Sequence, residues 1–314
     1  MKSSGAYFAA VTIRRGSGVK RIGYLGPEGT VSHESAALFF QGEQHAFFPF
    51  KLVADIFAAA VDGSIDYGVV PIENTIEGSV RMHVDSLVQE DSPPIRAEWT
   101  YPSRQNLIGH GDELLLKNGG GPDYARIRKI FSKDVAIAQC HRFLNAHMPD
   151  VEFEYVNSTA HGIRLVKENP GKGWAAIGTK HGSRMYDLAL LAENITDHHN
   201  NYTRFVLIGR DKPELQPSDN WKTTILVTLP EDFPGALHQV LSAFAWRRIN
   251  LTKIESRPTK LKLGSYYFYI DVEGTTESVL LPAALEEIEA LGCMVRVLGS
   301  YPSYPYEILK EVQA

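Results

Sequence analysis

The sequence has little cysteine and no excess of positive charge, and both facts narrow its possible functions. Only 2 of the 314 residues are cysteine, and neither Cys140 nor Cys293 lies in a CxxC motif or a Cys/His cluster with metal-ligand spacing. We therefore expect no metal and a reducing, cytoplasmic compartment. Because 32 Lys and Arg face 37 Asp and Glu, the formal net charge is -5. No global positive field is available for a nucleic acid or an anionic membrane, which favours a small-molecule ligand.

Long apolar runs are also missing. The longest one near the start, Ala6 to Ile13, is followed by Arg14 and Arg15, lacks a small-residue cleavage pattern and is too short to span a bilayer. We expect residues 1–20 to form a loosely held extension and the protein to have no membrane partner. With 44% hydrophobic residues, 26 Gly and 17 Pro, the composition is that of a soluble globular protein of about two domains.

From residue 21 onward, short apolar runs typical of strands alternate with helical patterns. The first unit is a strand at 21–25, a turn at 26–30 (GPEGT) and a helix containing 35–40. Further strands are expected at 67–71, 127–131, 151–156 and 175–177, and helices at 56–61, 79–88, 135–146 and 160–167. This alternation predicts an α/β domain with a largely parallel sheet. Residues 209–222 carry two prolines, many charges and almost no apolar periodicity, which places a domain boundary there.

The C-terminal part follows a different order of elements. Strands are expected at 223–229, 249–256, 266–272 and 294–298, with helices at 234–244 and 282–291. The order β-α-β-β-α-β is that of the ferredoxin-like arrangement, in which two helices pack on one face of an antiparallel sheet. Such a small module usually binds or regulates.

Polar residues follow two of the predicted strands. Residues 70–80 (VPIENTIEGSV) leave a strand with amide, hydroxyl and carboxylate groups at the edge where open α/β sheets bind ligands. A polar turn with Thr75 or Ser79 as a helix cap is the alternative. The GPEGT turn lacks the lysine of a phosphate loop and the GxGxxG spacing, so a nucleotide site is not expected. Its N–H groups could favour a carboxylate, or Thr30 could simply cap the helix.

Three more segments carry candidate residues. In 132–140 (SKDVAIAQC) and in Ser158-Thr159, small hydroxyl residues stand between a strand and a helix, which is typical of helix caps. In 200–205 (NNYTRF), Arg204 offers a planar fork for a carboxylate, or belongs to a solvated strand edge. The pair His198-His199 has no metal-ligand partner pattern and is expected to face solvent.

Taken together, GPEGT, VPIENTIEG, SKDVAIAQC, STA and NNYTRF resemble the prephenate dehydratase family. The segments PGALH (234–238) and ESRP (255–258) resemble the phenylalanine-binding signatures of the ACT domain that follows in that family. The resemblance covers about residues 21–305. It implies a two-lobed α/β catalytic domain, like a periplasmic binding protein, at 21–208, with crossovers near 96 and 196. A linker at 209–222, an ACT domain at 223–305 and a tail at 306–314 would follow.

The resemblance also implies an activity. Members of the family convert prephenate to phenylpyruvate, water and carbon dioxide without a cofactor, because loss of the ring carboxylate expels the hydroxyl and yields an aromatic ring. Phenylalanine would bind between paired ACT domains of a homodimer or homotetramer and inhibit. Two alternatives stay open: arogenate dehydratase, whose substrate carries an amine in place of the keto group, and a non-catalytic amino-acid sensor.

The family motifs carry implied roles onto this chain. Thr203 matches the threonine that donates a hydrogen bond to the leaving hydroxyl. Arg204 would clamp a carboxylate, although adjacent side chains on a strand point to opposite faces, so a structural role stays open. The implied catalytic residues are Thr203, Arg204, Asn74 and Gln139, with substrate contacts at Thr30, Thr75, Ser132, Ser158, Thr159 and Phe205. The implied phenylalanine site comprises Gly235, Ala236, Leu237, His238, Glu255, Ser256, Arg257 and Pro258.

The chain departs from the family pattern in two places. Lys133-Asp134 stands after Ser132 where the family segment often reads Ser-His-Pro, and Thr196-Asp197 stands where Gln-Asp commonly precedes the TRF segment. The first departure puts a role for the middle residue in doubt, while Gln139 and Cys140 still align.

Overall fold

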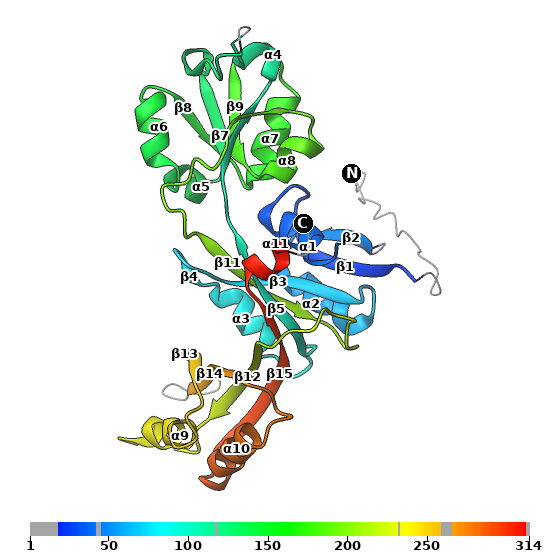
Figure 1. The fold of residues 1–314 in the computed structure, drawn as a ribbon, viewed down its shortest axis with the longest axis vertical. Coiled ribbons are helices and arrows are strands. Elements are labelled where there is room, and N and C mark those ends of the chain that lie inside the picture. The colour runs from blue at the N-terminus through cyan, green and yellow to red at the C-terminus, as the bar shows by residue number, and fades with distance from the viewer. Residues whose placement is uncertain (1–17, 42–44, 117–118, 232, 259–265, 312–314) are drawn as a thin grey trace, which may run out of the picture.

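The computed structural model describes residues 18–41, 45–116, 119–231, 233–258 and 266–311. Figure 1 shows two α/β lobes, one above the other, and a smaller module at the far end of the lower lobe. The predicted extension lies almost wholly outside the described residues, and the first strand already begins at Lys20. None of the helices in these ranges is long and apolar enough to cross a membrane.

The lower, first lobe is built on one end of a ten-stranded sheet. Its strands are β1 (Lys20–Leu25), β2 (His45–Phe50), β3 (Tyr67–Asn74), the short β4 (Gly78–Ser79), β5 (Ile95–Pro102) and β11 (Tyr202–Ile208). Its helices are α1 (Val31–Phe39), α2 (Val53–Asp62) and α3 (Arg81–Leu87). Strand β1 is parallel to β2 and β3, whereas β11 is antiparallel to β3 and β5. The β-turn-α opening predicted from residue 21 is confirmed.

The chain crosses to the second lobe after Pro102 and returns before Tyr202. The predicted first crossover, near residue 96, is therefore wrong, whereas the predicted return near 196 agrees with the structure. The reason is β5, which pairs with β11 from Ile95 to Pro102 and so belongs to the first lobe. Its sequence, IRAEWTYP, contains two charged residues and no clean apolar run, which hides the strand.

The second lobe has a five-stranded sheet in the order β10-β6-β9-β7-β8. The strands are β6 (Asn106–Gly109), β7 (Lys129–Ser132), β8 (Glu152–Tyr155), β9 (Trp174–Gly178) and β10 (Ala189–Ala192). The helices are α4 (Gly111–Leu114), the 3-10 turn Tyr124–Arg126, α5 (Asp134–Ala138), α6 (His141–His147), α7 (Thr159–Lys167) and α8 (Lys180–Met185). Because β7 is parallel to both β8 and β9, helices α5, α7 and α8 all begin at one edge of this sheet. Two lobes joined by two crossing segments are the predicted periplasmic-binding-protein-like arrangement.

The single helix predicted at 135–146 is broken in two. Helix α5 ends at Ala138, with Gln139 as its C-cap, and α6 starts at His141. The carboxylate of Asp197 accepts hydrogen bonds from the backbone N–H of Arg142 at 3.1 and 3.2 Å, which stabilises a new helix N-terminus. Asp197 comes from the returning crossover segment, so the break could not be derived from local sequence.

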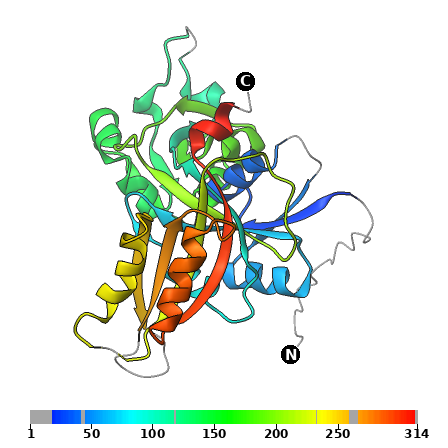
Figure 2. The ribbon, with the colours of Figure 1, turned by 60° about the horizontal axis from the view of Figure 1, so that its bottom comes forward.

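The C-terminal module confirms the predicted β-α-β-β-α-β order. Its elements are β12 (Trp221–Thr228), α9 (Ala236–Ala245), β13 (Leu251–Pro258), β14 (Tyr266–Glu273), α10 (Leu280–Ala290) and β15 (Met294–Tyr304), followed by α11 (Tyr306–Glu311). The strand order is β13-β14-β12-β15, and Figure 2 shows both helices on the same face of the sheet. Apolar residues of β12, β14, α9 and α10 form one buried cluster between them.

The sheet of this module continues into the first lobe. Strand β15 is 11 residues long, well beyond the predicted 294–298. Its last part pairs in parallel with β5, with Ser303 opposite Glu98 and Tyr304 opposite Trp99. The module is thus joined by backbone hydrogen bonds to the strand next to β11.

Candidate active site

Thr203 and Asn74 lie directly opposite each other where β11 and β3 pair. The Asn74 Nδ2 donates a hydrogen bond to the Thr203 Oγ1 at 3.0 Å, and the Ser103 Oγ lies 2.7 Å from the same oxygen. Ser103 was not predicted. It stands in the crossover just after β5, outside every motif, and only the three-dimensional pairing of β5 with β11 brings it to Thr203.

The carboxamide of Asn74 is held in one orientation. Its Oδ1 accepts hydrogen bonds from the backbone N–H groups of Ile76 at 2.9 Å and Glu77 at 3.0 Å. Because backbone N–H groups can only donate, the Nδ2 must face the other way, toward Thr203. There it also lies 2.8 Å from the Asn201 Oδ1 and 3.1 Å from the Tyr202 carbonyl oxygen. Every polar atom of this side chain is therefore occupied.

Asn201 extends the hydrogen-bonded chain into the second lobe. Its Nδ2 donates to the Oε1 of Gln139 at 3.0 Å, at the C-terminal end of α5. The predicted residues Asn74, Gln139 and Thr203 thus lie in one chain that crosses the junction of the lobes. Asn201, which is buried, is the unpredicted member that connects them.

The availability of the Thr203 proton depends on which hydroxyl donates in the contact with Ser103. A threonine hydroxyl has one donor and two acceptor positions, and Asn74 can only donate to it through Nδ2. When Ser103 also donates, Thr203 accepts twice and its own proton is free for a third oxygen. This is the arrangement of a neutral, preorganised donor.

Thr75 links the turn after β3 to β11. Its Oγ1 donates to the Asn200 carbonyl at 2.7 Å and accepts from the backbone N–H of Tyr202 at 2.9 Å. The alternative that Thr75 or Ser79 caps the next helix is wrong, because α3 begins at Arg81 and has Val80 at its N-cap without a side-chain hydrogen bond.

Arg204 lies on the face opposite to Thr203. Its Nε donates to Glu98 at 2.6 Å, and its Nη1 donates to Asp271 at 2.5 Å. Burial alone would lower the pKa of Arg204. The two carboxylates raise the pKa by more than burial lowers it, so that it lies well above its usual value. The placement contradicts the predicted substrate clamp and agrees with the structural alternative.

Two predicted substrate contacts are buried in the interior instead. Phe205 is 1% exposed and stacks on Trp99 with ring centroids 5.9 Å apart, within an apolar cluster under α1. Ser132 is fully buried, and its Oγ donates to the Ile177 carbonyl at 2.8 Å, tying β7 to β9. Both side chains are enclosed by neighbouring strands and helices, which contradicts a role in ligand contact.

Three other predicted contacts begin helices. Thr30 is the N-cap of α1 and accepts from the His33 N–H at 3.4 Å. Ser158 is the N-cap of α7 and accepts from the His161 N–H at 3.1 Å, with Thr159 as the first helical residue. The capping alternative is correct for Thr30 and Ser158, and the N–H groups they leave unpaired are the ones that favour anions. Lys133 is exposed at the N-cap of α5, and the His198-His199 pair is exposed as predicted.

The lobes also touch through α1 and α8, which no sequence motif indicated. The Thr179 Oγ1 donates to the Gly29 carbonyl at 2.8 Å, and the backbone N–H of His181 donates to the Glu34 carboxylate at 3.0 Å. The rings of His33 and His181 meet edge to face at 4.7 Å. Burial lowers the pKa of His33 to about 4, with a smaller contribution from His181, whereas burial raises the pKa of Glu34. Burial at this contact therefore favours the neutral forms of His33 and Glu34.

This contact predicts acid sensitivity. Because the pKa of His33 is about 4 in the folded protein and 6.5 for an unperturbed histidine, the unfolded chain binds the extra proton between these values. The contribution of His33 to the free energy of unfolding is therefore fully present above about pH 6.5 and is lost as the pH falls toward 4. His33→Phe, which keeps the stacking on Tyr24, should lose less thermal stability between about pH 7 and 5 than the unchanged protein. The exposed His198→Phe is the control and should leave the pH dependence unchanged, and equal losses in all three proteins would contradict the assignment.

In the C-terminal module, the two predicted phenylalanine-binding segments lie at the same end of the sheet. Strands β12 and β13 are both antiparallel to β14 and so run in the same direction. The residues after β12 (GALH, 235–238) and the end of β13 (ESRP, 255–258) therefore lie at the same end of the sheet. Gly235 has a φ of 97°, a left-handed conformation that suits glycine, and caps α9. Arg257 binds Asp85 of α3 and lies 3.3 Å from Glu255.

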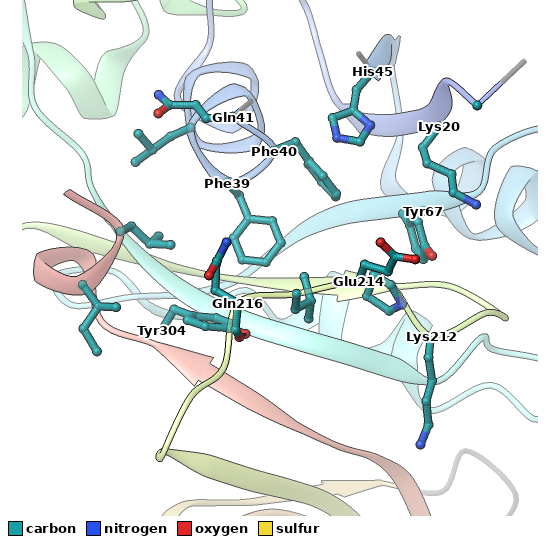
Figure 3. Close-up of a pocket in the computed structure, with 16 residues that line it drawn as sticks. Lys20, Phe39, Phe40, Gln41, His45, Tyr67, Lys212, Glu214, Gln216 and Tyr304 are labelled. Carbon is teal, nitrogen blue, oxygen red and sulfur yellow. The ribbon is translucent and has the colours of Figure 1, made fainter. Parts of the chain in front are cut away.

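A separate pocket of about 540 Å³ lies on the first lobe, away from this polar chain. Figure 3 shows Phe39, Phe40, Tyr67 and Tyr304 in its wall, with charged side chains of the segment after β11 at its rim. Its lining includes none of the predicted site residues. It borders Gly18, Gln41 and His45, each next to residues that the structure does not describe.

The comparisons with known proteins agree with this geometry. Residues 22–213 match the family model of prephenate dehydratase, and residues 223–293 match that of the ACT domain. Prephenate dehydratase of Bacillus subtilis (strain 168) is 42% identical over 291 residues, which cover 90% of this chain and 99% of the relative. Prephenate dehydratase from Arthrobacter aurescens, solved in complex with L-Phe, has a TM-score of 0.76 at 30% identity and 90% coverage of both chains. The Staphylococcus aureus subsp. aureus Mu50 structure has a TM-score of 0.75 at 28% identity, covering 90% of this chain and 99% of that one. The chain therefore belongs to the prephenate dehydratase family and carries an ACT domain after the catalytic domain.

Proposed function

We propose that the protein is a prephenate dehydratase, which converts prephenate to phenylpyruvate, carbon dioxide and water. Family membership and 42% identity to the Bacillus subtilis relative support this function. The observation that carries it is the Thr203 hydroxyl, which accepts from Asn74 and is free to donate when Ser103 also donates to it. A binding protein without turnover has no need of such a donor.

The reaction needs a donor at one point only. The bond between the ring and its carboxylate breaks, carbon dioxide leaves, and the electron pair of that bond moves into the ring. The C–O bond on the opposite carbon then breaks, and the hydroxyl takes up one proton and leaves as water. Thr203 stabilises the charge that develops on this oxygen, and a relay through water can supply the proton. The electrons come from the substrate itself.

Substrate carboxylates need separate partners, since Arg204 is not available. We assign this role to the amide groups at the starts of α1 and α7, next to Thr30 and to Ser158 and Thr159. Both helices begin at the carboxyl edge of their sheet, and Gln139 and Thr75 complete the proposed contacts at the junction. Contacts between the lobes through Gly29 and Thr179 would help to exclude water from the bound substrate.

Phenylalanine is the proposed allosteric inhibitor. The Arthrobacter aurescens relative was solved with L-Phe, and in this chain the GALH and ESRP segments share one end of the ACT sheet. Glu255 and Arg257 offer an acidic and a basic group to a zwitterion. We propose that two ACT domains pair around the ligand in a homodimer or homotetramer. A cytoplasmic location belongs to the same proposal and agrees with two buried, unpaired cysteines.

The direct test is an assay of the purified protein with prephenate, in which phenylpyruvate is followed by its absorbance in alkali. Turnover that falls when phenylalanine is added is the expected result. Faster turnover of arogenate would instead identify an arogenate dehydratase. Phenylalanine binding without turnover of either substrate would overturn the enzymatic proposal in favour of a sensor.

A further inference from the structure

The paired residues of β3 and β11 face two different parts of the molecule. Thr203 is opposite Asn74, and the next pair is Arg204 opposite Glu73. Because successive side chains on a strand point to opposite faces, the first pair lies at the junction of the lobes and the second faces the ACT domain. The residues that touch the ACT domain are thus joined by one peptide bond to those proposed to act on the substrate.

Six charged side chains meet where the ACT domain packs on the paired strands β3 and β11, which we call the β3–β11 ladder. We call these side chains the interdomain charge cluster. The Arg204 Nη1 lies 2.5 Å from Asp271 of β14 and 3.4 Å from Glu73, and its Nε lies 2.6 Å from Glu98 of β5. The other two cations come from the ACT domain. The members are Glu73, Glu98, Arg204, Lys222, Lys253 and Asp271.

Charge balance in the cluster requires both domains. The catalytic domain supplies two carboxylates and one guanidinium, whereas the ACT domain supplies two ammonium groups and one carboxylate. Lys222 lies 2.6 Å from Glu98, and Lys253 lies 3.0 Å from Glu73. Counted over these six groups, each domain alone would leave one charge uncompensated. This complementarity fixes which surfaces of the two domains meet.

The cluster cannot loosen without cost, because water does not reach its centre. Asp271 is fully buried and Glu98 is 2% exposed. Thr224 donates to the second oxygen of Asp271 at 2.6 Å, and Ser303 donates to Glu98 at 2.6 Å. A movement of β14 that Arg204 did not follow would leave a buried carboxylate without its cation, which is strongly unfavourable. Arg204 is held in the same way by Glu98 of the catalytic domain, so a movement of β14 acts on its guanidinium between the two domains.

The ESRP strand reaches the same cluster. Lys253 stands two residues before Glu255 on β13, so both side chains lie on one face, and their charged groups are 3.6 Å apart. Lys253 pairs across the sheet with Asp271 and binds Glu73 of the catalytic domain. Two routes thus lead from the ACT domain to the ladder, one to the neighbour of Asn74 and one to the neighbour of Thr203.

We propose that Arg204 is a positioning residue that couples the ACT domain to the leaving-group donor. The inference rests on the proposed function and adds the contact by which regulation reaches the site. Movement of the ACT sheet displaces the guanidinium through Asp271, and the guanidinium displaces the backbone of β11 that carries Thr203. Phenylalanine then lowers turnover through the geometry of Thr203 and Asn74, because it binds one position of the ACT sheet more tightly than the other.

The test separates binding of phenylalanine from inhibition by it. Asp271→Asn keeps the shape of the side chain and a hydrogen bond from Thr224 but removes the charge that holds Arg204. We expect titration calorimetry to give a dissociation constant for phenylalanine within about threefold of the unchanged protein. At saturating phenylalanine, the unchanged enzyme should lose about tenfold or more of its turnover, in the range of typical allosteric coupling, whereas the variant should lose less than about twofold.

The control is Asp66→Asn, which breaks a partly exposed ion pair with Arg21 inside the first lobe, away from the ACT domain. It should lower thermal stability but leave the extent of inhibition unchanged. Lys253→Gln removes the contact with Glu73 and should also reduce inhibition by phenylalanine. This variant replaces Asp271→Asn in the test if Asp271→Asn does not fold. Full inhibition in both ACT variants would overturn the inference, as would an active enzyme that phenylalanine does not inhibit. Absence of turnover in the unchanged protein would instead reject the proposed function.

Discussion

Thr203→Val is expected to lower kcat for prephenate by about 100-fold to 1,000-fold, the range found when one preorganised donor is removed from an active site. Valine keeps the β-branched shape that suits β11 but removes the hydroxyl that Asn74 and Ser103 orient. Asn74 retains its bonds to Asn201 and to the backbone, so the rest of the polar chain stays in place. We expect KM to change by less than about threefold, because the lost interaction strengthens only as the hydroxyl leaves. Steady-state kinetics of phenylpyruvate formation measure both quantities.

Two further variants separate chemistry from folding. Thr203→Ser keeps a hydroxyl within reach of Ser103 and should recover kcat to within about tenfold of the unchanged enzyme. Thr228→Val, at a half-buried strand position of the ACT domain, makes the same chemical change far from the site and should leave kcat unaltered. Equal activity of Thr203→Val and the unchanged protein would remove Thr203 from the mechanism. Phenylalanine binding should persist in every variant.

The sequence allows the architecture to be predicted wherever a strand reads as an apolar run. Strand β3 and the β-α-β-β-α-β module are of this kind, because their buried faces impose a regular pattern. Strand β5 is not, since its Glu98 is buried by pairing with Arg204 and Lys222 rather than by being apolar. The misplaced crossover follows from that one strand. The extension of β15 onto β5 is likewise set by a neighbour and not by its own residues.

The candidate site shows the same division. Thr203 and Asn74 could be identified because family motifs mark them and each lies at the end of a strand beside the junction. Ser103 carries no motif and reaches the site only through the crossover. Arg204 was assigned to the substrate because an arginine next to Thr203 suggests a carboxylate ligand. Its partners are Glu98 and Asp271, and the latter lies 67 residues away in another domain, which local pattern cannot reveal.

Arg204→Met is expected to lower the free energy of unfolding by about 3–5 kcal/mol, the usual cost when one partner of a buried ion pair is removed. Methionine fills much of the volume of the arginine stem but leaves Glu98 and Asp271 buried without their shared cation. Urea unfolding followed by circular dichroism at about pH 8 measures the loss. Arg21→Met, which breaks the partly exposed pair with Asp66, is the control and should cost about 1 kcal/mol or less.

The loss should depend on pH in a direction that identifies its cause. Burial raises the pKa of Glu98, but Arg204 first and then Lys222 outweigh it, so the pKa lies below its usual value. In the unchanged protein, this carboxylate therefore adds stability above its unfolded pKa and loses it as the pH falls through the folded value. Without Arg204 the effect of burial remains and the main opposing charge is gone, so the carboxylate takes up a proton more readily and acid relieves the penalty. Arg204→Met should thus be less destabilised relative to the unchanged protein at about pH 5 than at about pH 8. A loss that is equal at both pH values would indicate a packing defect rather than an unpaired buried charge.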